Sequence, residues 1–88
     1  MPEPVEVIVE GTPNPNAVKF TINRLVASQG KTYRDPAQAD VGWAKQLLAI
    51  PGVTQVFGVS NFIAITKAPT AEWEAIVPKA EHIVKESF

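Results

Sequence analysis

Two prolines alternate with two asparagines in the stretch Gly11-Thr12-Pro13-Asn14-Pro15-Asn16-Ala17-Val18-Lys19-Phe20. Proline fixes φ and has no backbone N–H, so Pro13 and Pro15 exclude a central strand or a helix interior at this point. Asn14 and Asn16 can hydrogen-bond to nearby backbone and tolerate turn conformations. The stretch therefore predicts a stiff loop, and from spacing alone a structural connection is favoured over a catalytic role.

Alternating side chains flank the loop on both sides. Valines alternate with other residues over 5–9, and apolar side chains alternate with polar ones over 18–23. A period of two over β-branched residues predicts two half-buried strands, which a short loop joins as an antiparallel hairpin. The next segment has no such period, and Ser28-Gln29-Gly30-Lys31 is interpreted as a turn.

A first helix is predicted from Val41 to Leu48, where apolar residues recur at helical spacing. Asp35-Pro36 and Asp40 are both plausible starts, because aspartate caps free amides and proline is tolerated in the first turn. Pro51-Gly52 ends the helix.

Two more strands and a second helix follow. The strands are predicted over 53–57 and 62–66, with a bulge or close approach at Gly58 and a turn at residues 60–61. Thr70 is a possible cap for the last helix, which Pro78 should kink or split. Four aromatic residues are predicted to lie in the core: Trp43, Phe57, Phe62 and Trp73.

The element order predicts an α+β fold. It is a two-layer ββαββα domain with a four-stranded, mainly antiparallel sheet and two helices on one face. With 88 residues and no interrupting linker, residues 1–88 are expected to form a single domain.

The composition excludes several function classes. The formal net charge is −1 and the basic residues are scattered, which argues against nucleic acid as a partner. There is no cysteine, so thiolate catalysis and thiolate ligation of a metal cluster by this chain are excluded. No apolar run is long enough to span a membrane, and the N-terminus has no signal-peptide pattern. A cytoplasmic protein without membrane partners is expected.

Residue patterns for chemistry are sparse. His82, the single histidine, forms an i, i+4 pair with Glu86, for which a surface ion pair is favoured over a metal site because a structural zinc needs about four ligands. An acylphosphatase-like hydrolase would use Arg24 or Arg34 with an asparagine, but such enzymes have a different element order. A phosphopeptide or small-ligand binder would require a basic pocket. A binding module without an active centre is favoured.

The run from Thr12 to Phe20 resembles the signature T-P-N-P-N-x-L-K-F of the N-terminal domain of Nfu/NifU-type iron–sulfur cluster scaffold proteins, with Val18 in place of leucine. Residues 44–53 are similar to the family's helix and its ending I-x-G-V. Residues 56–57 and 61–67 resemble its V-F…x-F-I-T-V-T-K hairpin, and Trp73 falls where the family has a tryptophan. The resemblance covers nearly the whole chain.

The resemblance implies a part in iron–sulfur cluster assembly. In the family a second domain carries the C-x-x-C pair that binds the cluster, so no cofactor is assigned here and partners are expected to handle the cluster. The expected role is a non-enzymatic domain that docks assembly proteins or apo client proteins, either alone or as a piece of a longer scaffold. The candidate interaction surface comprises Thr12, Asn14, Asn16, Lys19 and Asn61. A weak iron site built from carboxylates and His82 is the alternative.

Overall fold

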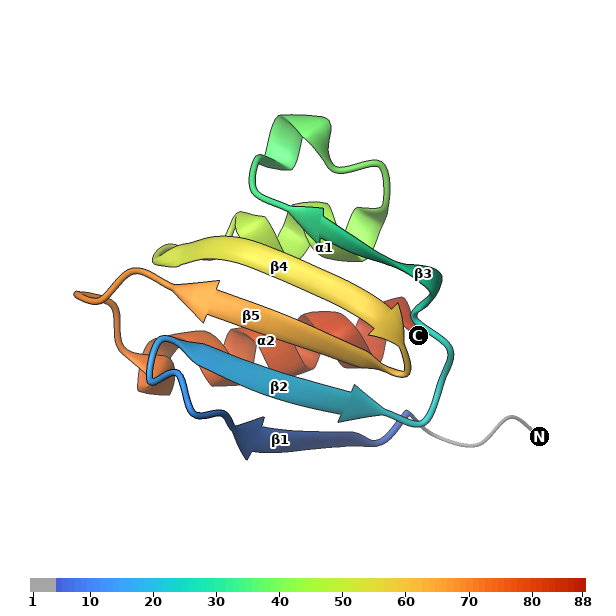
Figure 1. Ribbon diagram of the computed structural model, residues 1–88, viewed down its shortest axis with the longest axis horizontal. Coiled ribbons are helices and arrows are strands. Elements are labelled where there is room, and N and C mark those ends of the chain that lie inside the picture. Colours follow the sequence, from blue (N-terminus) through green and yellow to red (C-terminus); the bar gives the residue numbers. More distant parts are fainter. Residues whose placement is uncertain (1–4) are drawn as a thin grey trace.

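The computed structural model describes residues 5–88. Within that range one sheet contains five strands, β1 (Val7–Gly11), β2 (Ala17–Ile22), β3 (Ala27–Tyr33), β4 (Val53–Ser60) and β5 (Phe62–Lys67). The strand order is β1-β2-β5-β4-β3, and every neighbouring pair is antiparallel (Figure 1).

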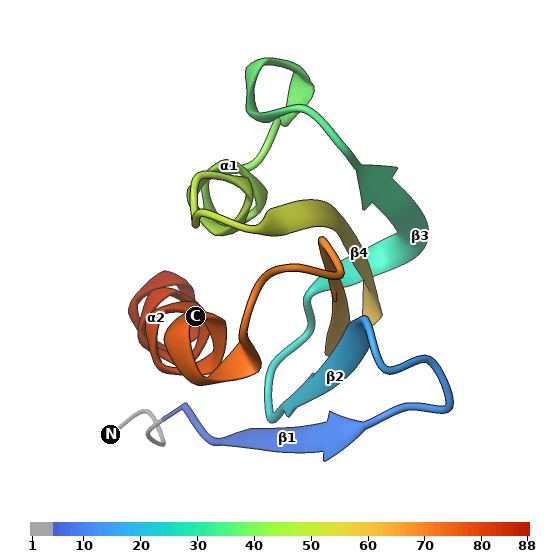
Figure 2. The same cartoon turned by 90° about the vertical axis from the view of Figure 1, so that its left-hand side faces the viewer.

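Two helices of the described range, α1 (Gly42–Leu48) and α2 (Trp73–Ser87), lie on the same side of this sheet (Figure 2). A short 3-10 helix, η1 (Pro36–Gln38), precedes α1. The two-layer α+β architecture is therefore confirmed. Neither helix in residues 5–88 is both long and apolar enough to cross a membrane.

The expectation of four strands was wrong, because the segment interpreted as a turn belongs to β3. Residues 28–32 are all exposed, and β3 pairs only with β4, with a register irregularity between Ala27 and Lys31. An edge strand is held by backbone hydrogen bonds on one side and needs no buried face along most of its length. Its sequence therefore lacks the alternation that reveals a half-buried strand.

The core lies between the sheet and the two helices. The predicted alternation over 18–22 is confirmed, since Val18, Phe20 and Ile22 are buried while residues 19 and 21 between them are half-buried. Across the sheet, Ile63 and Ile65 of β5 face the same core and are fully buried. The helices supply the other layer with Trp43, Ala44, Leu47, Leu48, Ile76, Ala80 and Val84.

The helix starts differ in part from expectation. Asp35 does act as a cap, but of η1, where its Oδ1 accepts the Ala37 N–H at 2.9 Å. Helix α1 begins at Gly42 with no side-chain cap, so Asp40 does not start it. Likewise Thr70 does not cap α2, which follows Glu72.

Helix α2 runs without a break through Pro78, so the expected split does not occur. Proline removes the N–H that would bond the carbonyl of Glu74, four residues earlier. Both Glu74 and Pro78 are exposed, so water can satisfy that carbonyl. The missing hydrogen bond is tolerated because it lies on the face of the helix that is turned away from the core.

Phe57 and Phe62 do not lie in the main core. They are half-buried on the face of the sheet opposite the helices, with ring centroids 6.2 Å apart. The Nζ of Lys19 lies 4.7 Å from the centroid of the Phe62 ring. This aromatic pair covers part of a sheet face over which no helix of the described chain packs (Figure 2).

Candidate functional site

The loop between β1 and β2 is held together by its own side chains. The Thr12 hydroxyl lies 2.9 Å from the carbonyl oxygens of both Asn14 and Ala17. The Asn14 Oδ1 accepts the Asn16 N–H at 2.9 Å, and the Ala17 N–H closes a turn on the Asn14 carbonyl at 3.0 Å. A hydrogen bond from an asparagine side chain to the backbone two residues on, with a proline between the two residues, is typical of such turns. The predicted hairpin connection between the first two strands is confirmed, and its own hydrogen bonds account for the predicted turn chemistry.

Two residues from distant parts of the chain fix the position of this loop. The indole Nε1 of Trp73, the first residue of α2, donates to the Pro15 carbonyl at 3.0 Å. Lys67, the last residue of β5, bonds Asn16 twice: its backbone N–H donates to the Asn16 carbonyl at 2.8 Å and its Nζ to the Asn16 Oδ1 at 3.2 Å. The Lys67 Nζ also lies 5.7 Å from the centroid of the Trp73 ring. We call residues 12–16 with Lys67 and Trp73 the pinned loop.

The five predicted surface residues do not form a single patch. Thr12, Asn14 and Asn16 lie together in the pinned loop. Lys19 extends from β2 over the open face of the sheet, whereas Lys67 lies on the core face. Asn61 lies beyond the opposite end of β2, where its carbonyl accepts the Ile22 N–H at 2.7 Å. The candidate surface that remains in one place is the loop between β1 and β2, with Thr12, Asn14 and Asn16.

Sequence reasoning missed Lys67 and assigned Trp73 to the core. A signal for Lys67 was present: it continues the alternation of Ile63 and Ile65, which places a lysine on the buried face of β5. Lys67 is indeed only 9% exposed. Trp73 is half-buried and its indole N–H bonds the loop, which explains why an amphipathic tryptophan suits this position.

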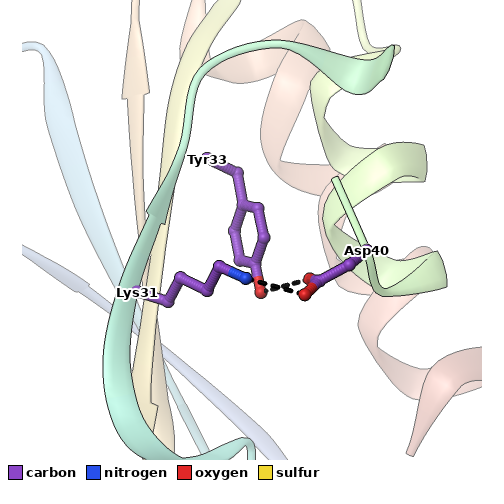
Figure 3. Close-up of polar contacts among 3 residues, drawn as sticks. All are labelled: Lys31, Tyr33 and Asp40. Carbon is purple, nitrogen blue, oxygen red and sulfur yellow. Dashed lines mark hydrogen bonds and ion pairs between the residues drawn. The ribbon is translucent and has the colours of Figure 1, made fainter. Parts of the chain in front are cut away.

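A second polar cluster links β3 to the segment before α1. Lys31 Nζ donates to Asp40 Oδ2 at 2.7 Å and Tyr33 Oη donates to Asp40 Oδ1 at 2.9 Å (Figure 3). These hydrogen bonds, that from Lys31 above all, hold the pKa of Asp40 below its ordinary value. The bond to Asp40 raises the pKa of Lys31, and burial raises the pKa of Tyr33. Both carboxylate oxygens are occupied by donors, which indicates a structural clamp.

Asp40→Asn is expected to lower the free energy of unfolding at neutral pH and to have little effect in acid. Folding lowers the pKa of the Asp40 carboxyl. The charged carboxylate therefore stabilises the fold at pH values above its ordinary pKa, and this stabilisation is lost as the pH falls through the lowered pKa. The raised pKa values of Lys31 and Tyr33 act at the alkaline end, where stabilisation is lost as the pH rises through them. Urea denaturation of both forms from neutral to acidic pH tests this. A stability difference that persists undiminished in acid would contradict it.

A shallow apolar groove of about 480 Å³ separates the end of α1 from the middle of α2. Ile50, Pro51, Pro78 and Ile83 supply apolar lining, and His82 lies at its border. His82 and Glu86 lie side by side on the helix surface as expected, with His82 Nε2 3.6 Å from Glu86 Oε1. Within residues 5–88, no three His, Cys, Asp or Glu side chains come close enough together to hold a metal ion.

The two arginines proposed for an acylphosphatase-like hydrolase, Arg24 and Arg34, contact different parts of the chain. Arg34 Nε donates to Gln55 Oε1 at 3.1 Å, and Arg24 Nη1 donates to the carbonyl of its neighbour Asn23 at 3.2 Å. Neither bond joins an arginine to the pinned loop. The loop thus has the best-defined geometry among the candidate sites.

Comparison with known families adds the remaining observation. Residues 7–88 match the family model described as scaffold protein Nfu/NifU N terminal. The chain belongs to this family. The match includes the whole pinned loop. This Nfu N-terminal domain contains no cysteine and therefore no C-x-x-C cluster-binding pair.

Relatives by sequence include conserved virulence factor C of Staphylococcus aureus, which is 38% identical over 71 residues. That match covers 80% of this Nfu N-terminal domain and 19% of the relative. The corresponding protein of Staphylococcus haemolyticus is 35% identical over 72 residues, covering 81% of this chain and 20% of the relative. This chain thus spans about a fifth of the length of the curated relatives it matches.

Solved structures of similar chains share the fold. The crystal structure of protein SAV1430 from Staphylococcus aureus is 30% identical and superposes with a TM-score of 0.76, covering 90% of this chain and 98% of that one. A solution structure of a Staphylococcus epidermidis protein is 28% identical with a TM-score of 0.65, covering 94% and 99% of the two chains. The Nfu N-terminal fold therefore also occurs in chains of about this size.

Proposed function

We propose that this chain is a non-enzymatic docking domain of iron–sulfur cluster assembly, and that the pinned loop is the surface it presents. Its partners are assembly proteins or apo client proteins rather than nucleic acid or membranes. The chain has no cysteine, so the cluster remains on thiolates of the partner. Membership of the Nfu N-terminal family supports the link to cluster assembly.

The observation that carries the docking role is the dense hydrogen bonding of an exposed loop. Asn14 and Pro15 are exposed, yet hydrogen bonds from within the loop, from β5 and from α2 fix the backbone around them. A segment that is already ordered loses little conformational entropy on binding, so more of its contact energy appears as affinity. The loop also lies at one end of the sheet, next to the start of α2.

Asn14→Asp tests the proposal without removing the bond that shapes the loop. The new carboxylate keeps the oxygen that accepts the Asn16 N–H, but it replaces the outward NH₂ donor with a negatively charged acceptor. The immobilised domain is incubated with host extract under anaerobic conditions, and bound proteins are quantified by mass spectrometry. Proteins with cysteine cluster ligands should be enriched on the native domain and about tenfold less on the variant, since tenfold corresponds to about 1.4 kcal/mol.

The matched control is Asn61→Asp, the same chemical change at the opposite end of β2. It should leave the enrichment of cluster proteins unchanged. Equal enrichment on the Asn14→Asp and native domains would overturn the docking role of the loop. A bound set without any iron–sulfur protein would overturn the link to cluster assembly.

A further inference from the structure

Lys67 is a buried ammonium group without a carboxylate partner. The residue is 9% exposed, and its Nζ has two neutral acceptors, the Asn16 Oδ1 at 3.2 Å and the Ala68 carbonyl at 3.4 Å. Both distances exceed the roughly 2.7–2.9 Å of charge-assisted hydrogen bonds. An ammonium group has three donors, so one donor of Lys67 has no acceptor among residues 5–88.

Other lysines of the same chain show the contrast. Lys31 and Lys85 are each about half-exposed, and each forms an ion pair, with Asp40 at 2.7 Å and Glu81 at 3.4 Å. Lysines are rarely buried unless they are paired, because removing a charge from water is costly. Lys67 is the most buried lysine among residues 5–88, and it has no carboxylate within ion-pair distance, although Glu72 and Glu74 follow it closely in sequence.

The side chain that contacts Lys67 adds another donor. The Asn16 Oδ1 is occupied by Lys67, and the Nδ2 of the same amide group has no acceptor among residues 5–88. The Trp73 ring lies beside the ammonium group, 5.7 Å from Nζ to the ring centroid, and its π face favours a cation there. The Lys67 end of the pinned loop thus offers donors and positive charge, while its acceptors are used internally.

We propose that Lys67 and Asn16, with the Trp73 ring behind them, form a carboxylate-binding site, and that its occupant is an aspartate or glutamate side chain of the docked partner. This inference rests on the docking function and names the chemistry that the loop recognises. The two oxygens of a carboxylate accept from Lys67 Nζ and Asn16 Nδ2 together. The partner thereby supplies the counter-charge that this chain lacks.

The experiment uses three small probes and the ¹⁵N-labelled domain. Acetyl-aspartate amide carries only a side-chain carboxylate, acetyl-alanine carries only a main-chain carboxylate, and acetyl-asparagine amide is the neutral control. Each is titrated at constant ionic strength in chloride, and the shifts of the Asn16 side-chain amide and the Trp73 indole N–H are followed by NMR. Saturable shifts are expected with acetyl-aspartate amide and none with the neutral control.

Two variants separate the site from a general charge effect. Lys67→Met removes the ammonium group at similar length, and Asn16→Asp places a carboxylate of the chain itself against Lys67. Both should weaken binding of acetyl-aspartate amide at least about tenfold, which is about 1.4 kcal/mol. Lys79→Met removes an exposed lysine on α2 and should leave binding unchanged. Asn16→Asp keeps the test decisive if Lys67→Met fails to fold.

Equal affinity in native and Asn16→Asp domains would overturn the proposal, as would shifts of equal size with the neutral probe. Tighter binding of acetyl-alanine would overturn the choice of an acidic side chain as the occupant. A different result is expected if the carboxylate site exists but the proposed docking function is wrong. In that case acetyl-aspartate amide still binds at Lys67, while cluster proteins are retained equally on the native and Asn14→Asp domains.

Discussion

Trp73→Ala is expected to lower the free energy of unfolding by about 2 kcal/mol or more. Truncating a fully buried tryptophan typically costs about 3–5 kcal/mol, and Trp73 is half-buried. The variant loses the hydrogen bond to Pro15 and removes the ring beside the Lys67 ammonium group. Urea denaturation measures the loss. Hydrogen exchange of the Ala17 amide, which closes the turn on Asn14, should become faster.

Trp73→Phe is the matched control, because it keeps a six-membered aromatic ring and removes the indole N–H together with part of the ring system. Its cost should be smaller than that of Trp73→Ala and includes that of one hydrogen bond, about 0.5–1.5 kcal/mol. Trp73 would be a packing residue without influence on the loop if both variants left the exchange of the Ala17 amide unchanged. That result would contradict the description of the loop as pinned.

Gly58→Ala is expected to lower the free energy of unfolding by about 1–3 kcal/mol, the usual cost of overpacking a core. A Cβ at this position would lie 2.6 Å from Cη2 of Trp43 and 3.1 Å from Cγ1 of Val26. The indole ring cannot easily move aside, because it packs against Tyr33 with centroids 5.8 Å apart and against Phe88 at 6.1 Å. Thermal or urea denaturation measures the difference.

Two controls identify the cause of that loss. Gly42→Ala places a methyl group at the start of α1, where no atom lies within 4 Å, and should not destabilise the domain. Trp43→Phe removes the part of the ring that a Cβ at residue 58 would meet. The cost of Gly58→Ala should therefore be smaller in the Trp43→Phe background. An equal cost in both backgrounds would contradict the proposed clash.

The sequence predicted the parts of the fold whose side chains alternate between core and solvent. Strands over 18–23 and 62–66 and the apolar stripe of α2 could be read directly, because burial imposes a period on them. Strand β3 could not, because its pairing with β4 depends on backbone groups and most of its side chains are exposed. A bulge or a close approach was expected at Gly58, and the close approach is present; Gly58 pairs with Ile63 of β5 and with Lys31 of β3, next to which the β3–β4 register shifts.

The loop residues of the candidate site could be predicted from the sequence, but the two residues that hold the loop in place could not. Thr12, Asn14 and Asn16 are neighbours in sequence, and their turn chemistry follows from local rules. Lys67 and Trp73 reach the loop through pairing of β2 with β5 and the placement of α2, which no local pattern specifies. Asn61 was grouped with the loop because the sequence does not reveal which end of the sheet a turn occupies.

The strand order has a kinetic consequence. Hairpins β1–β2 and β4–β5 are local, whereas pairing of β2 with β5 joins the two halves of the chain and must overcome a larger loop-closure entropy. The bonds of Asn16 to Lys67 and of Pro15 to Trp73 span 51 and 58 residues, so they cross the same junction. The hydrogen bonds within the loop are local, but its contacts with Lys67 and Trp73 form only when the halves unite. A partner that contacts the loop together with Lys67 and Trp73 therefore distinguishes the folded domain from chains in which the two halves are separate.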